Sequence, residues 1–285
     1  TMLQYSIWNP DINLFSLGSF SVRWYSLCWG IGILLAYVIV YQLYKQQRIP
    51  QEKFDPLLLY CFVGILVGAR LGHCLFYDPG YFLSHPVEMF LPIRQTVEGW
   101  QCTGYQGLAS HGGTVGLILA LWLYVRRTKL NLMRVLDNIA IATPFTACCI
   151  RLGNLMNSEI VGMPTSQPWG FIFVANQENF ARHPAQLYEA IAYFVFGLIG
   201  FWLYRRLRHK VGTGYFFGYC LTTIFVFRFL VEFLKEVQES WELSLRAATG
   251  LDEGQLLSIP FIILGLYCWA GGKFCKKLGE KPVKP

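Results

Sequence analysis

The residues of this chain best suited to chemistry form a polar cluster at the end of a long apolar stretch. Arg151, Asn154, Asn157, Glu159 and Gly162 follow one another where the apolar segment 136–156 ends. At the centre of a membrane-spanning helix, one arginine costs about 2.5–3.5 kcal/mol. Such a cluster is tolerated where it lines a polar cavity, so it indicates a functional site.

The spacing of Arg151 and Asn154 indicates what this site could bind. The two residues are three positions apart, so they are neighbours on one face of a helix. A guanidinium fork with an amide donor beside it is suited to grip a phosphate. The alternative is structural, with Arg151 in an ion pair with Glu159 or with an acid distant in the sequence.

His111 opens another apolar segment and is followed by Gly112 and Gly113. Paired glycines allow a backbone to approach a neighbouring helix or a ligand closely. An imidazole can accept a proton near neutral pH, so His111 is a candidate general base. The alternative is an interfacial histidine that bonds to a loop carbonyl.

Two more arginines lie within apolar segments. Arg228 and Glu232 are four residues apart, so they can pair with each other or share a polar cavity. Mutual neutralisation of the two charges is the structural alternative. Arg70 lies in a Gly64-x-x-x-Gly68-Ala-Arg70-Leu-Gly72 segment, whose glycine spacing is typical of a helix-packing face.

Composition predicts which elements position these residues. The chain is 54% hydrophobic and 14% charged, and its mean hydropathy is +0.38, whereas soluble domains are roughly 25% charged. We expect an all-α integral membrane protein, a bundle of seven transmembrane helices in a single domain over residues 1–285. The expected spans are 22–44, 57–77, 111–125, 136–156, 184–204, 213–234 and 255–271, each near the ~20 residues that cross a bilayer. Because these runs are continuously apolar rather than alternating, a β-barrel is disfavoured.

Charge placement predicts the orientation. Lysines and arginines gather in alternate connections, around 45–53, 126–134, 205–210 and 273–284. The positive-inside rule then places the C-terminus in the cytoplasm and the N-terminus outside. The sizeable loops 78–110 and 157–183 become extracytoplasmic, and an alternating pattern over Trp169–Val174 predicts a short strand in the second. The net charge of +7 follows from this topology and needs no nucleic-acid partner. The cysteines show no metal-ligand spacing, so neither a metal nor a cofactor is expected.

Five motifs occur in an order that resembles one known family, the bacterial phosphatidylglycerol–prolipoprotein diacylglyceryl transferases. The resemblance extends from about Trp24-Tyr25 to Pro260. The motifs are His111-Gly112-Gly113, Arg151-Leu-Gly-Asn154-x-x-Asn157-x-Glu159-x-x-Gly162, Arg182-His183-Pro184-x-Gln186-Leu-Tyr188-Glu189, Arg228-x-x-x-Glu232-Phe and Gly254-Gln255-Leu-Leu-Ser258-Ile-Pro260.

The resemblance implies a multi-pass enzyme of the bacterial cytoplasmic (inner) membrane with an outward-facing site. It would move diacylglycerol from phosphatidylglycerol to the lipobox cysteine thiol of a prolipoprotein signal peptide. A thioether forms and glycerol phosphate is released, as the first step of lipoprotein maturation. The partners are thus phosphatidylglycerol, the prolipoprotein and membrane lipids.

The resemblance also implies roles for individual residues. His111, Arg151 and Arg228 would be catalytic, with His111 assisting the thiol and the arginines binding phosphate. The residues that would bind substrate are Arg151, Asn154, Asn157, Glu159, Gly162, Tyr25, Arg70 and Glu232. The chain departs from some members at Ile224, where they have a tyrosine one turn before the equivalent of Arg228. Tyr219 or Tyr188 could supply that hydroxyl.

Two other function classes fit the composition. A transporter or flippase for anionic lipids would use the same arginines without making a bond. A seven-helix receptor is disfavoured by the His-Gly-Gly turn, by the intramembrane asparagines and by the lack of a retinal-type lysine in the last span. Product formation separates an enzyme from a transporter.

Overall fold

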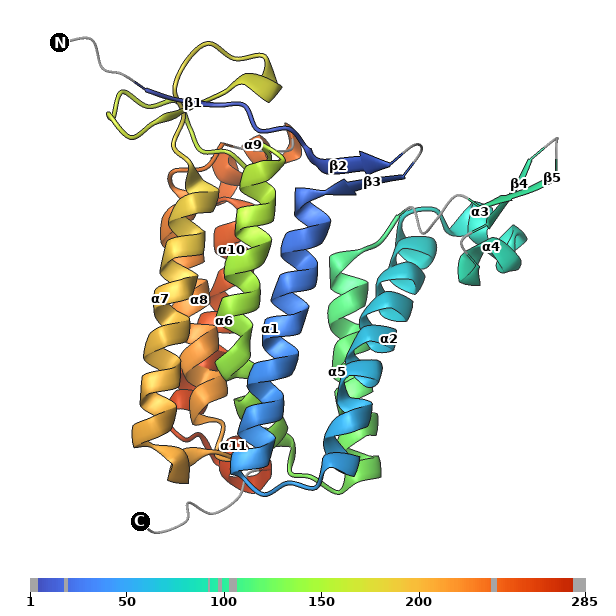
Figure 1. The fold of residues 1–285 in the computed structure, drawn as a ribbon, viewed down its shortest axis with the longest axis vertical. Coiled ribbons are helices and arrows are strands. Elements are labelled where there is room, and N and C mark those ends of the chain that lie inside the picture. Colours follow the sequence, from blue (N-terminus) through green and yellow to red (C-terminus); the bar gives the residue numbers. More distant parts are fainter. Residues whose placement is uncertain are drawn as a thin grey trace. The chain divides into compact units, whose positions relative to one another are not determined.

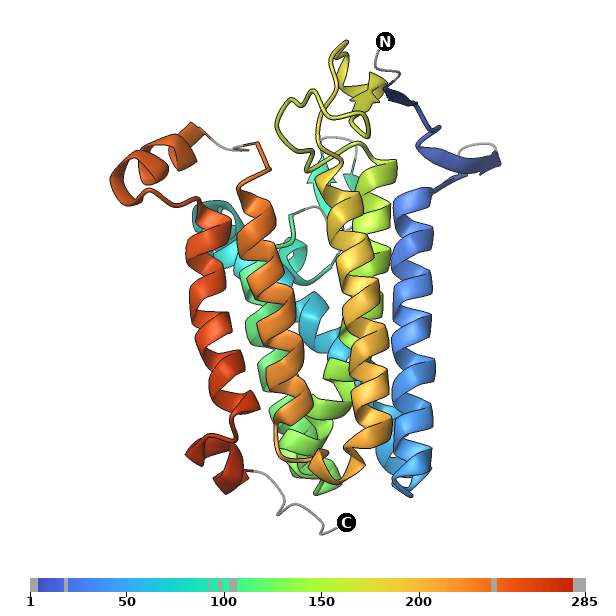
Figure 2. The same ribbon diagram turned by 90° about the vertical axis from the view of Figure 1, so that its left-hand side faces the viewer.

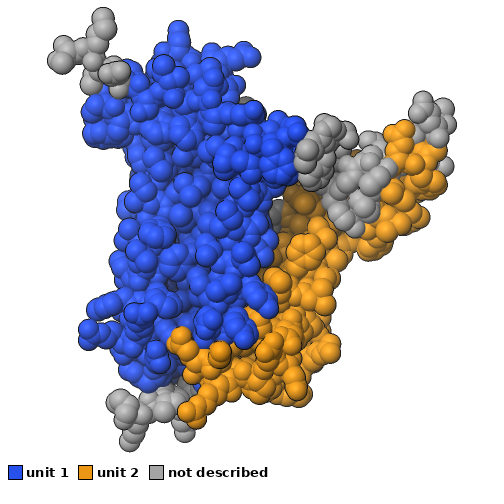
Figure 3. Space-filling model, viewed as in Figure 1, with its two compact units in different colours: residues 1–43, 133–285 blue, residues 44–132 orange. Residues whose placement is uncertain are grey.

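The computed structural model describes residues 5–17, 20–91, 93–96, 99–102, 107–236 and 240–278. The chain divides into two compact units (Figure 3). Unit 1 comprises residues 1–43 and 133–285, and unit 2 comprises residues 44–132.

Unit 1 is built on long helices that run side by side (Figures 1 and 2). They are α1 (Trp24–Gln46, whose last residues belong to unit 2), α6 (Leu132–Met156), α7 (Ala185–Arg206), α8 (Tyr215–Glu232) and α10 (Glu253–Trp269). Shorter helices are α9 (Ser240–Thr249), α11 (Lys273–Leu278) and the 3-10 turns η1 (Val174–Asn176) and η2 (Arg208–Lys210). Strand β1 lies at one end of the long helices and α11 lies at the other (Figures 1 and 2).

The strands of unit 1 form two small sheets. Strand β1 (Ser6–Trp8) pairs in parallel with β6 (Phe171–Phe173), and Ser6 lies opposite Phe171. Strand β2 (Asn13–Leu17) pairs antiparallel with β3 (Phe20–Arg23). The predicted short strand near residues 169–174 is confirmed by β6.

Unit 2 is an antiparallel pair of helices with smaller elements at one end. The pair consists of α2 (Gln51–Phe76) and α5 (Ser110–Thr128), and between them come α3 (Pro79–Ser84), α4 (Pro86–Phe90), β4 (Ile93–Thr96) and β5 (Gly99–Cys102). A Cβ at Gly68 would lie 2.4 Å from the carbonyl oxygen of Gly112, and one at Gly116 would lie 2.0 Å from that of Gly64. The glycine spacing of α2 is therefore a packing face, as the sequence predicts.

The helices have the length and composition of membrane spans. Five of them, α1, α2, α6, α7 and α8, are long and apolar enough to cross a bilayer, and α10 is a shorter apolar helix of 17 residues. Their surfaces carry large apolar side chains, such as Leu34, Leu198 and Ile263, which are 60%, 51% and 62% exposed. In a bilayer these side chains face lipid rather than water. A multi-pass, mainly helical membrane protein is therefore confirmed.

One buried carboxylate fixes α6 against the start of α8. Asp137 is fully buried and accepts hydrogen bonds from the backbone N–H groups of Gly212 (2.8 Å), Gly214 (3.0 Å) and Phe217 (2.8 Å). These donors lie at a helix N-terminus, where a negative charge is favourable. The anchor holds the α7–α8 turn at the end of unit 1 opposite to the polar cluster described next.

Candidate active site

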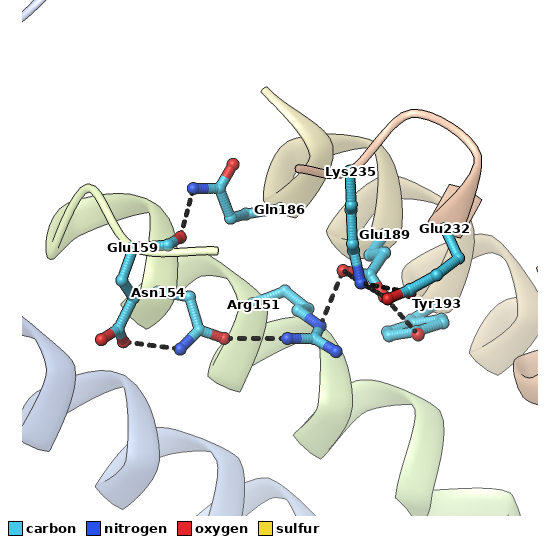
Figure 4. A network of polar contacts seen from close by, with 8 residues as sticks. All are labelled: Arg151, Asn154, Glu159, Gln186, Glu189, Tyr193, Glu232 and Lys235. Atoms are coloured by element: carbon cyan, nitrogen blue, oxygen red, sulfur yellow. Dashed lines mark hydrogen bonds and ion pairs between the residues drawn. The ribbon is translucent and has the colours of Figure 1, made fainter. Parts of the chain in front are cut away.

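The polar cluster of unit 1 forms where the ends of three helices meet (Figure 4). Arg151 lies near the C-terminal end of α6, Glu189 lies near the start of α7, and Glu232 is the last residue of α8. Because these consecutive helices alternate in direction, all three positions lie at the same end of unit 1. The sequence thus brings together residues that are up to 81 positions apart.

Arg151 is held on two sides and keeps one nitrogen available. Its Nε lies 3.0 Å from Glu189 Oε2, and its Nη1 donates to Asn154 Oδ1 at 3.2 Å. Its side chain is 13% exposed. Its Nη2 has no hydrogen bond to any residue in the described part of the chain. Arg151 therefore forms an ion pair with Glu189, an acid distant in the sequence. Its guanidinium still has N–H groups that donate to no described residue.

Asn154 links Arg151 to Glu159, and Asn157 also contacts Glu159. Asn154 Nδ2 donates to Glu159 Oε1 at 2.7 Å, and Asn157 Nδ2 lies 3.4 Å from the same oxygen. Gln186 Nε2 donates to the backbone oxygen of Glu159 at 2.5 Å. Asn157 Oδ1 is buried and has no partner among the described residues. It is therefore an acceptor available to a hydroxyl or amine donor.

Glu189 and Lys235 are central to the cluster but are absent from the predicted site residues. Glu189 is fully buried and Lys235 is 5% exposed. Lys235 Nζ lies 3.3 Å from both carboxylate oxygens of Glu189, and Tyr193 donates to Glu189 Oε1 at 3.1 Å. Glu189 was visible in the Arg182–Glu189 motif. Lys235 gave no such signal, because a lysine beyond the end of a span is typical of an exposed loop.

Lys235 also changes the expected pairing of Arg228. Glu232 Oε2 binds Lys235 Nζ at 3.2 Å, so the carboxylate that is four residues from Arg228 is taken by another cation. Arg228 forms no ion pair or hydrogen bond with any residue described in the structure, and it lies close enough to Tyr193 for an electrostatic interaction. Arg228 is therefore a partly buried cation without a carboxylate partner in this part of the molecule.

Ile224 packs in the apolar cluster that contains Tyr193. This cluster therefore brings a tyrosine of α7 near Ile224. Tyr219 donates to Phe196 O at 3.0 Å, and the Tyr188 hydroxyl lies 3.1 Å from His183 Nδ1. Of these three tyrosines, Tyr193 is the one bonded to Glu189.

The loop over the cluster is tied down by Arg182 and Gly162. Arg182 donates to Glu178 at 2.5 and 2.6 Å, and to the carbonyl oxygen of Gly162 at 3.2 Å. Its Nη1 lies 2.8 Å from Glu236, and the neighbouring Glu178 raises the pKa of Arg182. A Cβ at Gly162 would lie 2.6 Å from His183 Cβ. Close packing thus explains the glycine at position 162.

Tyr25 and Gly153 meet where α1 packs on α6. A Cβ on Gly153 would lie 2.9 Å from Tyr25 Cδ2, so the Tyr25 ring covers the backbone next to Asn154. The Tyr25 hydroxyl accepts a hydrogen bond from Trp29 Nε1 at 3.1 Å. The structure thus places Tyr25 beside the polar cluster.

His111 and Arg70 belong to unit 2. His111 is exposed in the first turn of α5, and its ring has no hydrogen bond to a residue that the structure describes. The buried Arg70 donates to the carbonyl oxygens of Glu88 (2.6 Å) and Met89 (3.1 Å). The contacts of Arg70 therefore hold α4 on α2, whereas the imidazole of His111 remains accessible.

The charges of the cluster favour an anion. Its buried and partly buried members are three cations and two carboxylates, namely Arg151, Arg228, Lys235, Glu189 and Glu232. With the exposed Glu159 set apart, the cluster has an excess of one positive charge. An excess positive charge in a low-dielectric site attracts an anionic group. Together with the free Nη2 of Arg151, this arrangement suits a phosphate.

Lys235 provides a test of the cluster. Lys235→Met should remove one of the two cations of the buried Glu189 and leave the partly buried Glu232 without its cation, which is destabilising. We expect a lower unfolding temperature in detergent, whereas Lys235→Arg should stay close to wild type. Differential scanning fluorimetry of the purified variants measures this. Equal unfolding temperatures for Lys235→Met and wild type would show that the pairs contribute nothing.

Comparisons with known proteins match nearly the whole chain. A family model described as prolipoprotein diacylglyceryl transferase matches residues 12–270. Phosphatidylglycerol–prolipoprotein diacylglyceryl transferase of Bacteroides fragilis is 57% identical over 261 residues, which cover 91% of this chain and 92% of the relative. The proteins of the same name from Porphyromonas gingivalis and Tolumonas auensis are 43% and 42% identical, and cover 94% and 91% of this chain and 94% of each relative. The matched region contains every residue of the polar cluster.

Proposed function

Because the chain belongs to the prolipoprotein diacylglyceryl transferase family, we propose that its polar cluster binds the phosphate of phosphatidylglycerol during transfer. The enzyme transfers the diacylglyceryl group of this lipid to the cysteine thiol of a prolipoprotein. The observation that carries the phosphate assignment is that Arg151 Nη2 and the Arg228 guanidinium form no hydrogen bond or ion pair with the residues that the structure describes. Glu189 and Asn154 hold the Arg151 guanidinium in place before substrate arrives, and Lys235 holds Glu189. This preorganisation lowers the cost of binding.

The atoms and charges of the proposed transfer step balance. The thiol sulfur attacks the glycerol carbon that carries the phosphate, a C–S bond forms, and the C–O bond to phosphate breaks. The thiol proton passes to His111, and glycerol phosphate departs with an additional negative charge. Preorganised cations beside this charge stabilise it in the transition state.

The glycerol headgroup has acceptors beside the phosphate site. Asn157 Oδ1 has no partner in the described structure, and Glu159 is exposed. We assign both as acceptors for headgroup hydroxyl groups. Tyr25 packs on Gly153, next to Asn154 of the cluster.

We also propose which helices cross the membrane and in which direction. We place α5 and α10 in the bilayer with the five long apolar helices, which gives seven spans in the bacterial inner membrane. The polar cluster and β1 then lie outside, and α11 with its lysines lies in the cytoplasm. The positions of β1 and α11 at opposite ends of unit 1 (Figure 1) and the positive-inside rule support this orientation.

An assay for product tests the transferase against a lipid transporter. Purified protein in detergent is given phosphatidylglycerol and a lipobox peptide, and released glycerol phosphate is measured. We expect release that requires the peptide cysteine and stops when this cysteine is replaced by serine. Specific binding of phosphatidylglycerol without any release would instead favour a transporter.

A further inference from the structure

A large apolar groove follows the α2–α5 pair of unit 2. Its volume is about 1060 Å³, and every residue that lines it belongs to unit 2. Leucines and valines of the two helices form its walls, including Val63, Val67 and Leu71 on α2 and Val115, Leu119 and Leu123 on α5. Among the lining residues, His111 is the one that carries an imidazole.

The glycine contact explains the depth of the groove. Gly64 and Gly68 of α2 face Gly116 and Gly112 of α5, and a Cβ at any of these positions would meet backbone atoms of the other helix at less than 3.0 Å. The two backbones therefore approach closely, and glycines and the small Ala109 and Ala120 lie between the walls of the groove. The longer valines and leucines on both sides rise above these small residues.

We propose that this groove holds the acyl chains of the phospholipid substrate, with the lipid glycerol at His111. The inference rests on the proposed function, and it names the place where that reaction takes its lipid chains. At about 30 Å³ for each water-sized group, the volume accommodates about 35 methylene-sized groups, which is the content of two long acyl chains. The α2 wall from Leu59 to Leu75 extends about 24 Å, longer than the roughly 15 Å depth of one leaflet.

A lipid fits the groove better than an apolar peptide helix does. Helices associate in membranes through small residues that let backbones approach. Here the glycines of α2 and α5 already contact each other, so they leave no such face for a third helix. Flexible acyl chains can fill a narrow groove between apolar walls without a small-residue contact.

Because His111 lines the groove, acyl chains that bind there should affect catalysis. The two acyl chains are attached to the other two carbons of the glycerol whose phosphate-bearing carbon the thiol attacks. Chains seated in the groove would therefore place the reacting carbon near the imidazole. Long chains should then raise the reaction rate through positioning as well as through affinity.

Chain length provides the test. Val67→Trp and Val115→Trp fill the groove at positions that are 44% and 57% exposed, so the protein core is untouched. We expect each to lower kcat/KM at least 10-fold for dipalmitoyl phosphatidylglycerol and less than 2-fold for the dihexanoyl lipid. Val38→Trp, at a position of α1 that is 45% exposed and outside the groove, is the matched control. Equal losses for both lipids, unchanged rates, or a rise confined to the KM of the lipobox peptide would overturn the proposal.

A binding measurement tests the groove proposal independently of the proposed function. Phosphatidylglycerol with a photoreactive diazirine in one acyl chain is crosslinked to the protein, and labelled peptides are identified by mass spectrometry. We expect labels on residues 59–75 and 115–123 that are lost in Val67→Trp and kept in Val38→Trp. This readout needs no turnover, so labels elsewhere would reject the groove even in an active enzyme.

Discussion

Replacing Arg151 with alanine is expected to lower kcat/KM for phosphatidylglycerol by about 100-fold or more. Removal of one preorganised donor to a developing anion typically costs 10²–10³ in rate. Arg151→Lys should be intermediate, because it retains a charge for Glu189 but loses the planar fork. Release of glycerol phosphate with a fixed lipobox peptide measures the effect.

Arg205→Ala is the matched control for Arg151. Arg205 lies at the other end of α7, where it stacks over the ring of Phe201 at 4.9 Å. This variant loses a cation without touching the polar cluster, so its rate should remain near that of wild type. An Arg151→Ala enzyme within about threefold of wild type would mean that the guanidinium does not stabilise the leaving phosphate.

Replacing His111 with glutamine should lower turnover at pH 7 by about 100-fold, the lower range for loss of a general base. A free thiol has a pKa of about 8.5, so at pH 9 most of the substrate thiol ionises without help. The defect should therefore shrink as the pH rises from 7 to 9. Rates at both pH values with the same peptide measure this.

His85→Gln is the control for His111, because the His85 ring bonds to the carbonyl oxygen of Tyr81 at 2.9 Å and stacks on its ring. This variant should keep the pH profile of wild type. Near-normal turnover of His111→Gln at pH 7 would remove His111 from the mechanism.

The helices were predictable because continuous apolar runs leave few alternatives in a membrane protein. Each expected span overlaps a helix of the structure, from α1 over 22–44 to α10 over 255–271. The small elements were mostly missed. Helices α3, α4 and α9 and strands β4 and β5 lie in the connections between the spans, and strands β2 and β3 precede the first span. These segments are too short for a long hydrophobic period to mark them.

The residues of the candidate site were predicted better than the ion pairs and hydrogen bonds between them. Arg151 and Asn154 are bonded as their spacing suggested, because residues three apart share a helical face. The ion pairs of Glu189 and Glu232 depend on how α6, α7 and α8 meet, and no local spacing contains that information. Glu232 pairs with Lys235 rather than with Arg228. The turn after α8 places Lys235 beside Glu232, and no spacing within a helix predicts this turn.

The most direct test of the phosphate site is an experimental structure of the protein with dihexanoyl phosphatidylglycerol. The phosphate oxygens should lie about 2.7–2.9 Å from Arg151 Nη2 and from the guanidinium of Arg228, the distances of charge-assisted hydrogen bonds. Arg151 should keep its contacts with Glu189 and Asn154. A phosphate bound by other cations, with Arg151 and Arg228 both unliganded, would contradict the account.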